Sequence, residues 1–98
     1  MNELLAEIFQ TAEKEQKNEQ QLVLKLMEEV GETAQALLSS QKAPGSEYKH
    51  LTTEDVQEEL ADTLLVTLAL FQKLGVSNEQ LHCLLRTKLA KWQAKQDA

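Results

Sequence analysis

A five-residue acidic motif, called an acidic word below, occurs twice in this chain. Each copy lies inside a stretch whose apolar residues recur at helical spacing. The two copies read EEVGE at residues 28–32 and EELAD at residues 58–62. In each copy the last two acids are three residues apart, so their Cβ atoms lie on one helix face about 5–6 Å apart. The acids of these two pairs are Glu29, Glu32, Glu59 and Asp62. Packed face to face, the four carboxylates would repel one another unless a cation lay among them.

The rest of the chain also has a helical pattern. It contains one Pro and three Gly and shows no strand-like alternation, which predicts an all-α fold. We expect four helices, at residues 3–16, 19–39, 53–74 and 78–91. Thr52 and Ser77 have the character of N-caps and Gly75 that of a C′ residue, while the only Pro-Gly pair lies in one long loop at 39–52. Short connections favour a four-helix bundle, with residues 1–98 as a single domain.

Hydrophobic periodicity predicts which helix faces point inward. The first helix carries Leu4, Leu5, Ile8, Phe9 and Ala12 on one face. The second carries a stripe of Leu22, Val23, Leu26, Met27, Val30, Ala34, Leu37 and Leu38. The fourth has Trp92 on the same face as Leu81, Leu85 and Leu89, so we expect this tryptophan in a core or an interface.

The third helix is apolar almost all round between residues 64 and 71, where only Thr67 is polar. Such a helix must be covered on every side. A chain of 98 residues buries only about 60–65% of its unfolded surface and provides few helices to cover it. We therefore expect a homo-oligomer whose interface includes this helix. The alternative is a helix at the centre of its own bundle.

Charge and composition exclude several classes of partner. The formal net charge of −6 argues against non-specific binding to nucleic acid or to an anionic membrane. Cys83 is the only cysteine, which excludes an internal disulfide and fits a reducing compartment. The N-terminus lacks the pattern of a signal peptide, and the apolar run at 64–71 is too short to span a bilayer. The expected location is cytoplasmic.

The acidic residues allow two interpretations, a metal site or solvated helix faces. On the third helix, one stripe contains Asp55, Glu59, Asp62, Val66, Ala69 and Lys73. Carboxylates on a stripe that continues as apolar residues are costly to bury unless they are paired or bind metal. On the second helix, Glu29 lies about 100° from the centre of the apolar stripe and Glu32 lies further round. These two would face solvent in a single bundle, or face inward if another helix lay across them.

The ligand types indicate which metal a shared site would take. Neither His50 nor His82 follows one of these glutamates by three residues, as it would in a di-iron bundle. An all-oxygen set suits Mg²⁺, or alternatively Mn²⁺. Because Mg²⁺ is usually held by a few carboxylates together with substrate phosphates, the expected substrate carries a diphosphate or triphosphate.

These residues resemble the MazG-like, all-α nucleoside triphosphate pyrophosphohydrolases. The resemblance lies in KLMEEVGETAQAL at residues 25–37 and VQEELADTLLVTLALFQKLGV at 56–76. It implies an enzyme that hydrolyses a (d)NTP to the monophosphate and pyrophosphate, assembled as a homodimer or a dimer of dimers. By position, the implied Mg²⁺ ligands are Glu29, Glu32, Glu59 and Asp62.

The resemblance also suggests further roles. Glu28 matches an additional acid of the family motif, and the general base would be Glu28, Glu29 or Glu32. Lys88 matches a phosphate-binding lysine, and Lys25 is a weaker candidate for substrate binding. Trp92 and Gln93 stand where family members often have other residues.

One related subfamily fits this chain less well, and one alternative function stays open. The related phosphoribosyl-ATP pyrophosphohydrolases usually have Tyr-His after the metal-binding Asp. Residues 64–67 of this chain read LLVT, so that subfamily fits less well. The alternative function is a non-catalytic helical oligomer that binds nucleotide or a partner protein through a degenerate site.

Overall fold

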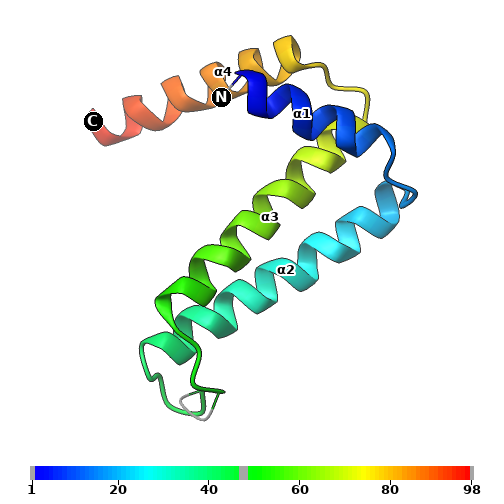
Figure 1. Cartoon of the computed structure of the whole chain (residues 1–98). Helices are drawn as coiled ribbons and strands as arrows, with labels where there is room; N and C mark the ends of the chain where they lie inside the picture. Colours follow the sequence, from blue (N-terminus) through cyan, green and yellow to red (C-terminus); the bar gives the residue numbers. More distant parts are fainter. Residues whose placement is uncertain (1, 47–48, 98) are drawn as a thin grey trace.

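A computed structural model of the chain describes residues 2–46 and 49–97. These residues form four helices, and none of them lies in a strand: α1 (Asn2–Glu13), α2 (Glu19–Ser40), α3 (Thr53–Lys73) and α4 (Asn78–Asp97). The predicted all-α class is confirmed. α2 and α3 run side by side as an antiparallel hairpin, α1 lies across one end of it, and α4 extends past α1 (Figure 1).

Local capping signals set most helix boundaries. Thr52 forms a reciprocal capping box with Asp55 at the start of α3, and Ser77 forms one with Gln80 at the start of α4. Gly75 follows α3 with a φ of 81°, in the left-handed region that suits glycine at C′. Asn18 forms a further capping box at the start of α2, which we did not predict.

Two helix ends differ from the prediction. α1 ends at Glu13 because the amides of Lys14 and Glu15 bond to carbonyls three residues back, which tightens the last turn. α4 continues to Asp97, six residues further than expected. The segment 92–97 contains neither Gly nor Pro, so nothing in it stops a helix.

The hydrophobic core lies where α1 crosses the end of α3 and the start of α4. Its buried residues are Leu5, Phe9, Leu68 and Leu81, and Ile8, Phe71 and Val76 pack against them. Most of the predicted face of α1 is therefore correct, although Leu4 is exposed. The core stabilises the end of the α2–α3 hairpin that lies next to α1. At the other end, the described residues of α2 and α3 pack against each other.

The orientation of α2 corrects the sequence prediction. Its buried residues are Leu22, Glu29, Ala36 and Ser39. Most of the predicted inward stripe is exposed instead, namely Val23, Met27, Val30, Ala34, Leu37 and Leu38. The physical reason is that α3 packs along the side of α2 that carries small and polar residues, where two helices can approach closely. The most apolar side of α2 is left without a partner among the described residues.

The middle of α3 is also only partly covered. Leu68 is buried, but Leu64 is 58% exposed and Leu65 is 46% exposed. Within the described residues, no single helix has the length and apolar character needed to cross a membrane. The α3–α4 pair meets those two criteria only jointly, and it is bent by 119°.

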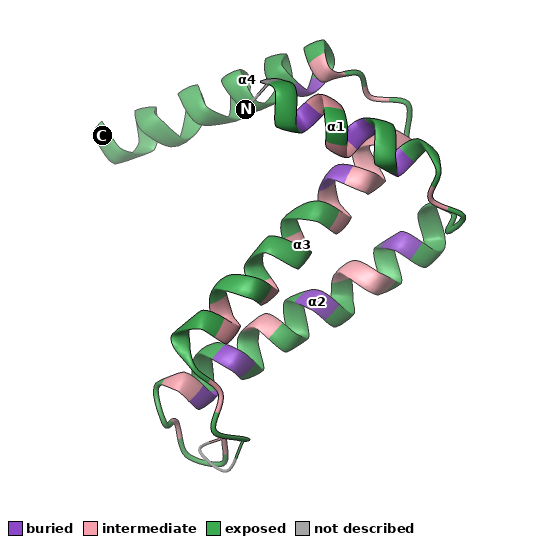
Figure 2. Cartoon of the chain, viewed as in Figure 1, coloured by how far each residue is buried: buried purple, intermediate pink, exposed green. Residues whose placement is uncertain are grey.

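The single chain has an open shape. Its radius of gyration is 16.1 Å, whereas a compact domain of this length has a radius of about 13 Å. Its accessible surface is 7494 Å², compared with about 5,700 Å² for a compact monomer of the same mass. Figure 2 shows that the exposed surface includes nearly all of α4 and one side of each hairpin helix.

We expect the exposed apolar side of α2 to associate with a second copy of the chain. The assembly should bury more than about 1,500 Å² in total, as stable interfaces do. Sedimentation at micromolar concentration should show a dimer or a larger species. The double substitution Met27→Glu and Val30→Glu should dissociate it by placing charges on the apolar side.

Gln10→Glu provides a control for added negative charge, because it places one carboxylate at an exposed position on α1. This variant should sediment like the wild type. A wild-type chain that stays monomeric at micromolar concentration would contradict the expected association.

Candidate metal centre

The two acidic words occupy facing segments of α2 and α3, thirty residues apart in the sequence. A threonine follows each copy, and the hydroxyl oxygens of Thr33 and Thr63 lie 3.2 Å apart across the helix contact. Each hydroxyl oxygen is also within hydrogen-bond distance of the carbonyl four residues earlier, at Glu29 (2.7 Å) and Glu59 (2.8 Å), so one hydroxyl donates across the contact and the other donates to its own helix. The two threonines therefore join the helices at the acidic words. We did not predict their role, although their repeated position after each word was a signal for it.

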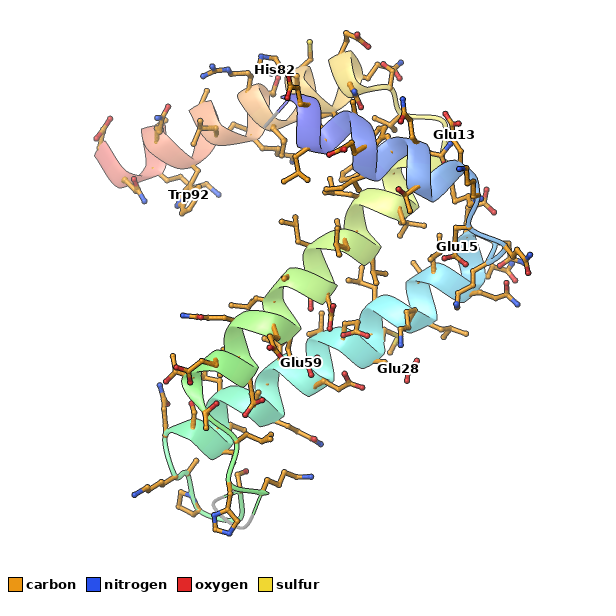
Figure 3. All side chains as sticks on the ribbon, viewed as in Figure 1. Glu13, Glu15, Glu28, Glu59, His82 and Trp92 are labelled. Carbon is orange, nitrogen blue, oxygen red and sulfur yellow. The ribbon has the colours of Figure 1, made fainter. Side chains whose placement is uncertain are left out.

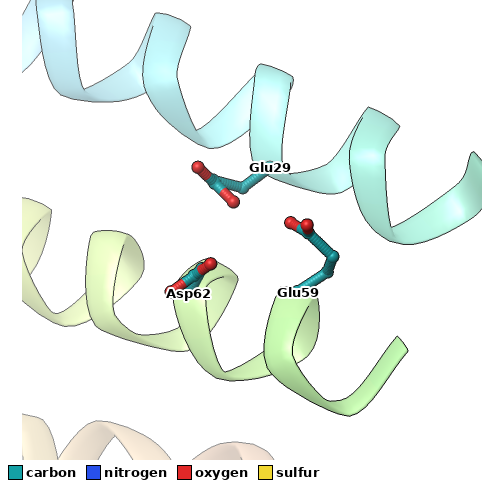
Figure 4. Close-up of side chains that lie close together, drawn as sticks. All are labelled: Glu29, Glu59 and Asp62. Carbon is teal, nitrogen blue, oxygen red and sulfur yellow. The ribbon is translucent and has the colours of Figure 1, made fainter. Parts of the chain in front are cut away.

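Three of the four predicted ligands come together. Glu29, Glu59 and Asp62 each offer a carboxylate oxygen, and these atoms all lie within 4.8 Å of one another. Figure 4 shows Glu29 projecting from α2 toward Glu59 and Asp62 of α3. Glu29 is 5% exposed, Glu59 is half-buried and Asp62 is exposed, so the cluster runs from the helix contact to the surface.

The fourth predicted ligand, Glu32, is exposed and lies beside Glu59, where the two carboxyl groups share a hydrogen bond. Burial is the largest of several effects that raise the pKa of Glu59 to about 7 from an ordinary value of 4.5. The hydrogen bond with Glu32 comes next, and the negative charges of Glu32, Glu29 and Asp62 add to it. The neighbouring acids are thus close enough to hinder the ionisation of Glu59.

One lysine, Lys25, lies beside the cluster of acids. The Lys25 ammonium is 3.2 Å from Oε1 of Glu29, one helical turn away on α2. This contact raises the pKa of Lys25, and the charges of Glu28, Glu29 and Glu32 add to the effect. Lys25 is therefore held close to the acids by the fold, while Glu28 is exposed beside them.

The donor set fits a hard divalent cation. Oε2 of Glu29 and Oε2 of Glu59 are buried and have no hydrogen-bond partner in the described part of the chain. Unpartnered buried carboxylate oxygens are costly, and a cation among them would satisfy both. The cluster contains only oxygen donors, which suit Mg²⁺ or Mn²⁺ better than zinc or copper. These atoms thus support the predicted metal site.

A cavity of about 580 Å³ adjoins this centre, between α1, α2 and α3. Lys25 lines it, and so do Val66 and Ala69, which continue the stripe of Glu59 and Asp62 along α3. The cavity has the size of a small-molecule site. A second cavity, of about 640 Å³, lies between α1 and α4, and among the described residues neither cavity is lined by an acid of the two words.

Lys88 does not join the acids in the same chain. It is exposed on α4, which packs against α1. The groups that shift the pKa of Glu59 are all acids, and the Lys25–Glu29 pair is the only salt bridge of the described residues that includes one of the predicted ligands. In Figure 3, Trp92 lies on the part of α4 that extends away from Glu59. The predicted role of Lys88 in phosphate binding stays a prediction.

Comparison with known proteins gives one match. A family model described as phosphoribosyl-ATP pyrophosphohydrolase matches residues 2–87. The matched segment includes both acidic words and ends one residue before Lys88. No curated protein and no solved structure matches the chain.

The raised pKa of Glu59 predicts how the stability of the metal-free protein depends on pH. Because the folded-state pKa is about 7 and the ordinary value is 4.5, the protonated side chain stabilises the fold. This contribution is fully present below about pH 4.5 and is lost as the pH rises through 7. Chemical denaturation in EDTA should therefore show stability falling between pH 5 and pH 8.

Glu59→Gln should flatten this fall, because it keeps a neutral side chain at every pH. Glu58→Gln is the matched control, because Glu58 is the exposed neighbour of Glu59 on α3. The interpretation fails if the wild type and Glu59→Gln have parallel pH profiles.

A divalent cation should stabilise the fold by mass action, because it binds the assembled acids and not the unfolded chain. The melting temperature should be higher in millimolar MgCl₂ than in EDTA. Asp62→Asn should abolish the difference, and Glu13→Gln on α1 should retain it. A wild-type melting temperature that is the same in both buffers would count against a shared metal site.

Proposed function

The chain belongs to the phosphoribosyl-ATP pyrophosphohydrolase family, and from this premise we propose that it is an Mg²⁺-dependent enzyme that releases pyrophosphate from a nucleoside triphosphate. The family is one of pyrophosphohydrolases. The observation that carries the proposal is the cluster of Glu29, Glu59 and Asp62, with two buried oxygens that lack partners. Hydrolysis of a phosphoanhydride is the reaction for which such a centre is suited.

The metal ligands in this proposal are Glu29, Glu59 and Asp62, with Glu32 completing the set beside Glu59. When bound, Mg²⁺ supplies positive charge to the phosphate oxygens, and Mn²⁺ can replace it. Burial of Glu59 and the charges of the neighbouring acids oppose the ionisation of this ligand. Binding of a cation would favour the ionised form of Glu59 and release a proton.

In the proposed reaction, the oxygen of a water molecule forms a bond to the α-phosphorus. The bond from that phosphorus to the bridging oxygen of the β-phosphate breaks, and pyrophosphate leaves. A carboxylate accepts the proton of the attacking water. Glu28 and Glu32 are exposed beside the cluster and could accept this proton directly, whereas the buried Glu29 is held by Lys25.

The adjoining cavity provides a place for the nucleoside. Lys25 lies at both sites, with its ammonium at Glu29 and its side chain on the cavity wall. A triphosphate on the acidic centre would thus place its sugar and base toward Val66 and Ala69. Lys25 would donate to the phosphates once the cation competes with it for Glu29.

A second candidate substrate is phosphoribosyl-ATP, which the matched family name specifies. The matched family is related to the MazG-like enzymes that the sequence resembles, so that resemblance is confirmed. The LLVT that follows Asp62-Thr63 still differs from the usual phosphoribosyl-ATP pyrophosphohydrolase pattern. Both substrates contain a triphosphate, so the same metal centre serves both. The residues around the cavity would decide between them.

The test of the proposed function is a panel of (d)NTPs and phosphoribosyl-ATP assayed for pyrophosphate release with Mg²⁺. Release from at least one nucleotide is expected. If no nucleotide is hydrolysed, the alternative is a non-catalytic helical oligomer that binds nucleotide or a partner protein.

Removing one metal ligand should reduce the rate much more than it reduces substrate binding. Glu59→Gln keeps the size of the side chain and removes its charge. We expect kcat to fall at least about 100-fold, on the order of 3 kcal/mol of transition-state stabilisation. Steady-state kinetics of pyrophosphate release measure this directly.

Glu13→Gln is the control, because Glu13 is exposed at the end of α1. It should leave kcat and KM unchanged. Equal activity of Glu59→Gln and the wild type would exclude the catalytic interpretation of the centre.

A further inference from the structure

The two ends of the α2–α3 hairpin are held by contacts that its middle does not have. Next to α1, the hydrophobic core packs Leu68 of α3 against Leu5 and Phe9. At the other end, the Ser39 hydroxyl accepts a hydrogen bond of 2.9 Å from the Leu51 amide, which ties the segment before α3 to α2. The acidic words lie between these two ends.

The middle of the hairpin lacks a large buried apolar side chain among the described residues. From residue 29 to residue 39, the buried residues of α2 are Glu29, Ala36 and Ser39. The facing turns of α3 carry Glu59 and Asp62, and like charges at this separation repel. Something other than apolar packing or charge must therefore set the distance between the helices at the acidic words.

The Thr33–Thr63 contact lies at this position, and each threonine is fixed to a turn that carries a predicted metal ligand. Thr33 follows Glu29 by one turn, Thr63 follows Glu59 by one turn, and each hydroxyl reaches the carbonyl of that glutamate. A β-branched side chain has few χ1 rotamers in a helix, and the bond to the carbonyl four residues back selects one of them. The 3.2 Å contact therefore relates two backbone turns and not two flexible side chains.

The hydroxyl protons can serve this contact in either of two arrangements. If Thr63 donates to Thr33, the Thr33 hydroxyl donates to the carbonyl of Glu29. If Thr33 donates to Thr63, the Thr63 hydroxyl donates to the carbonyl of Glu59. Both arrangements connect the backbone of one metal ligand to the opposite helix. A threonine hydroxyl carries no charge, so the pair can hold the helices whether or not the acids are ionised.

We infer that the Thr33–Thr63 pair is a positioning device that sets the spacing of the carboxylates across the hairpin, and thereby the divalent cation that the metal centre prefers. The inference rests on the proposed function, because it concerns the same centre. Both threonines act through Glu29 and Glu59. They are positioning residues and not ligands, since their hydroxyls are engaged with backbone carbonyls and with each other.

A fixed spacing matters more for Mg²⁺ than for Ca²⁺. Mg²⁺ demands near-octahedral geometry with oxygens at about 2.0–2.1 Å, whereas Ca²⁺ accepts more oxygens, at about 2.3–2.6 Å, in flexible arrangements. The fold brings carboxylate oxygens of Glu29, Glu59 and Asp62 within 4.8 Å of one another. A pair that holds them at a set spacing favours the smaller and stricter ion, so its loss should weaken Mg²⁺ binding more than Ca²⁺ binding.

Cation binding tests this inference without any assay of activity. Mn²⁺ is titrated into the whole chain, free Mn²⁺ is counted by EPR, and displacement by Mg²⁺ and by Ca²⁺ gives a Kd for each ion. Thr33→Val keeps the shape of the side chain and removes its hydroxyl. This variant should raise the Kd for Mg²⁺ at least about tenfold, as the loss of a group that orients a metal ligand commonly does. The Kd for Ca²⁺ should rise less than about threefold, because Ca²⁺ tolerates variable geometry.

Two further substitutions show whether the contact itself is responsible. Thr33→Ser keeps the hydroxyl and should retain the wild-type Kd for Mg²⁺ to within about twofold. Thr63→Val should match Thr33→Val, since each removes the same contact. The double variant should bind Mg²⁺ no more weakly than either single variant, because one contact can be lost only once.

Thr67→Val is the matched control. The Thr67 hydroxyl also donates to the carbonyl four residues earlier on α3, at Thr63 (2.8 Å), and the side chain is half-buried like that of Thr63. Within the described residues, this hydroxyl forms no hydrogen bond to α2. The control should keep the wild-type Kd for both ions.

The outcomes separate the inference from the proposed function. The inference alone is overturned if Thr33→Val leaves the Kd for Mg²⁺ unchanged, or if it weakens Mg²⁺ and Ca²⁺ binding equally, or if Thr67→Val weakens Mg²⁺ binding as much. A wild type that binds no divalent cation would overturn the inference and the proposed function together. A chain that shows the expected affinities and hydrolyses no nucleotide would retain the positioning role and remove the enzyme.

Discussion

Holding the Glu29 carboxylate between two helices fixes the orientation of α2, because the side of the helix that carries this acid must face α3. The side chain is 5% exposed, and one of its oxygens has no partner in the described chain. Burial of a charge is costly unless it is paired, and among the described residues only Lys25 forms a salt bridge with Glu29. The arrangement is stable because Thr33 and Thr63 join the helices beside the acids, and because a cation can satisfy the remaining oxygens.

This orientation explains the open shape of the chain. With Glu29, Ala36 and Ser39 turned toward α3, the leucines, valines and methionine on the other side of α2 point away from the hydrophobic core. A small domain cannot leave such a side in water without losing much of its hydrophobic stabilisation. The proposed metal centre and the exposed apolar side of α2 therefore have a common cause. We propose that assembly buries the apolar side of α2. Assembly would then recover the hydrophobic stabilisation that is lost because acids, and not leucines, face α3.

Local sequence signals predicted more of the fold than hydrophobic periodicity did. Thr52, Ser77 and Gly75 act on backbone groups within four residues, so their roles were readable from the sequence. The clustering of Glu29, Glu59 and Asp62 was also predictable, because the repeated word places the acids on facing helices. The orientation of α2 was not predictable, since a stripe shows which face is apolar and not which neighbour covers it. The separation of Lys88 from the acids depends on the 119° bend after α3, which no local pattern encodes.

Charge balance links the acidic hairpin to the basic helix. The hairpin gathers Glu28, Glu29, Glu32, Glu59 and Asp62 around a single lysine. Burial and the neighbouring acids together raise the pKa of Glu59 to about 7. A divalent cation offsets part of the negative charge, but a triphosphate brings in several more negative charges. Four exposed cations, Arg86, Lys88, Lys91 and Lys95, lie on α4, which the chain directs away from the hairpin. The described residues thus keep the acidic and the basic surfaces apart.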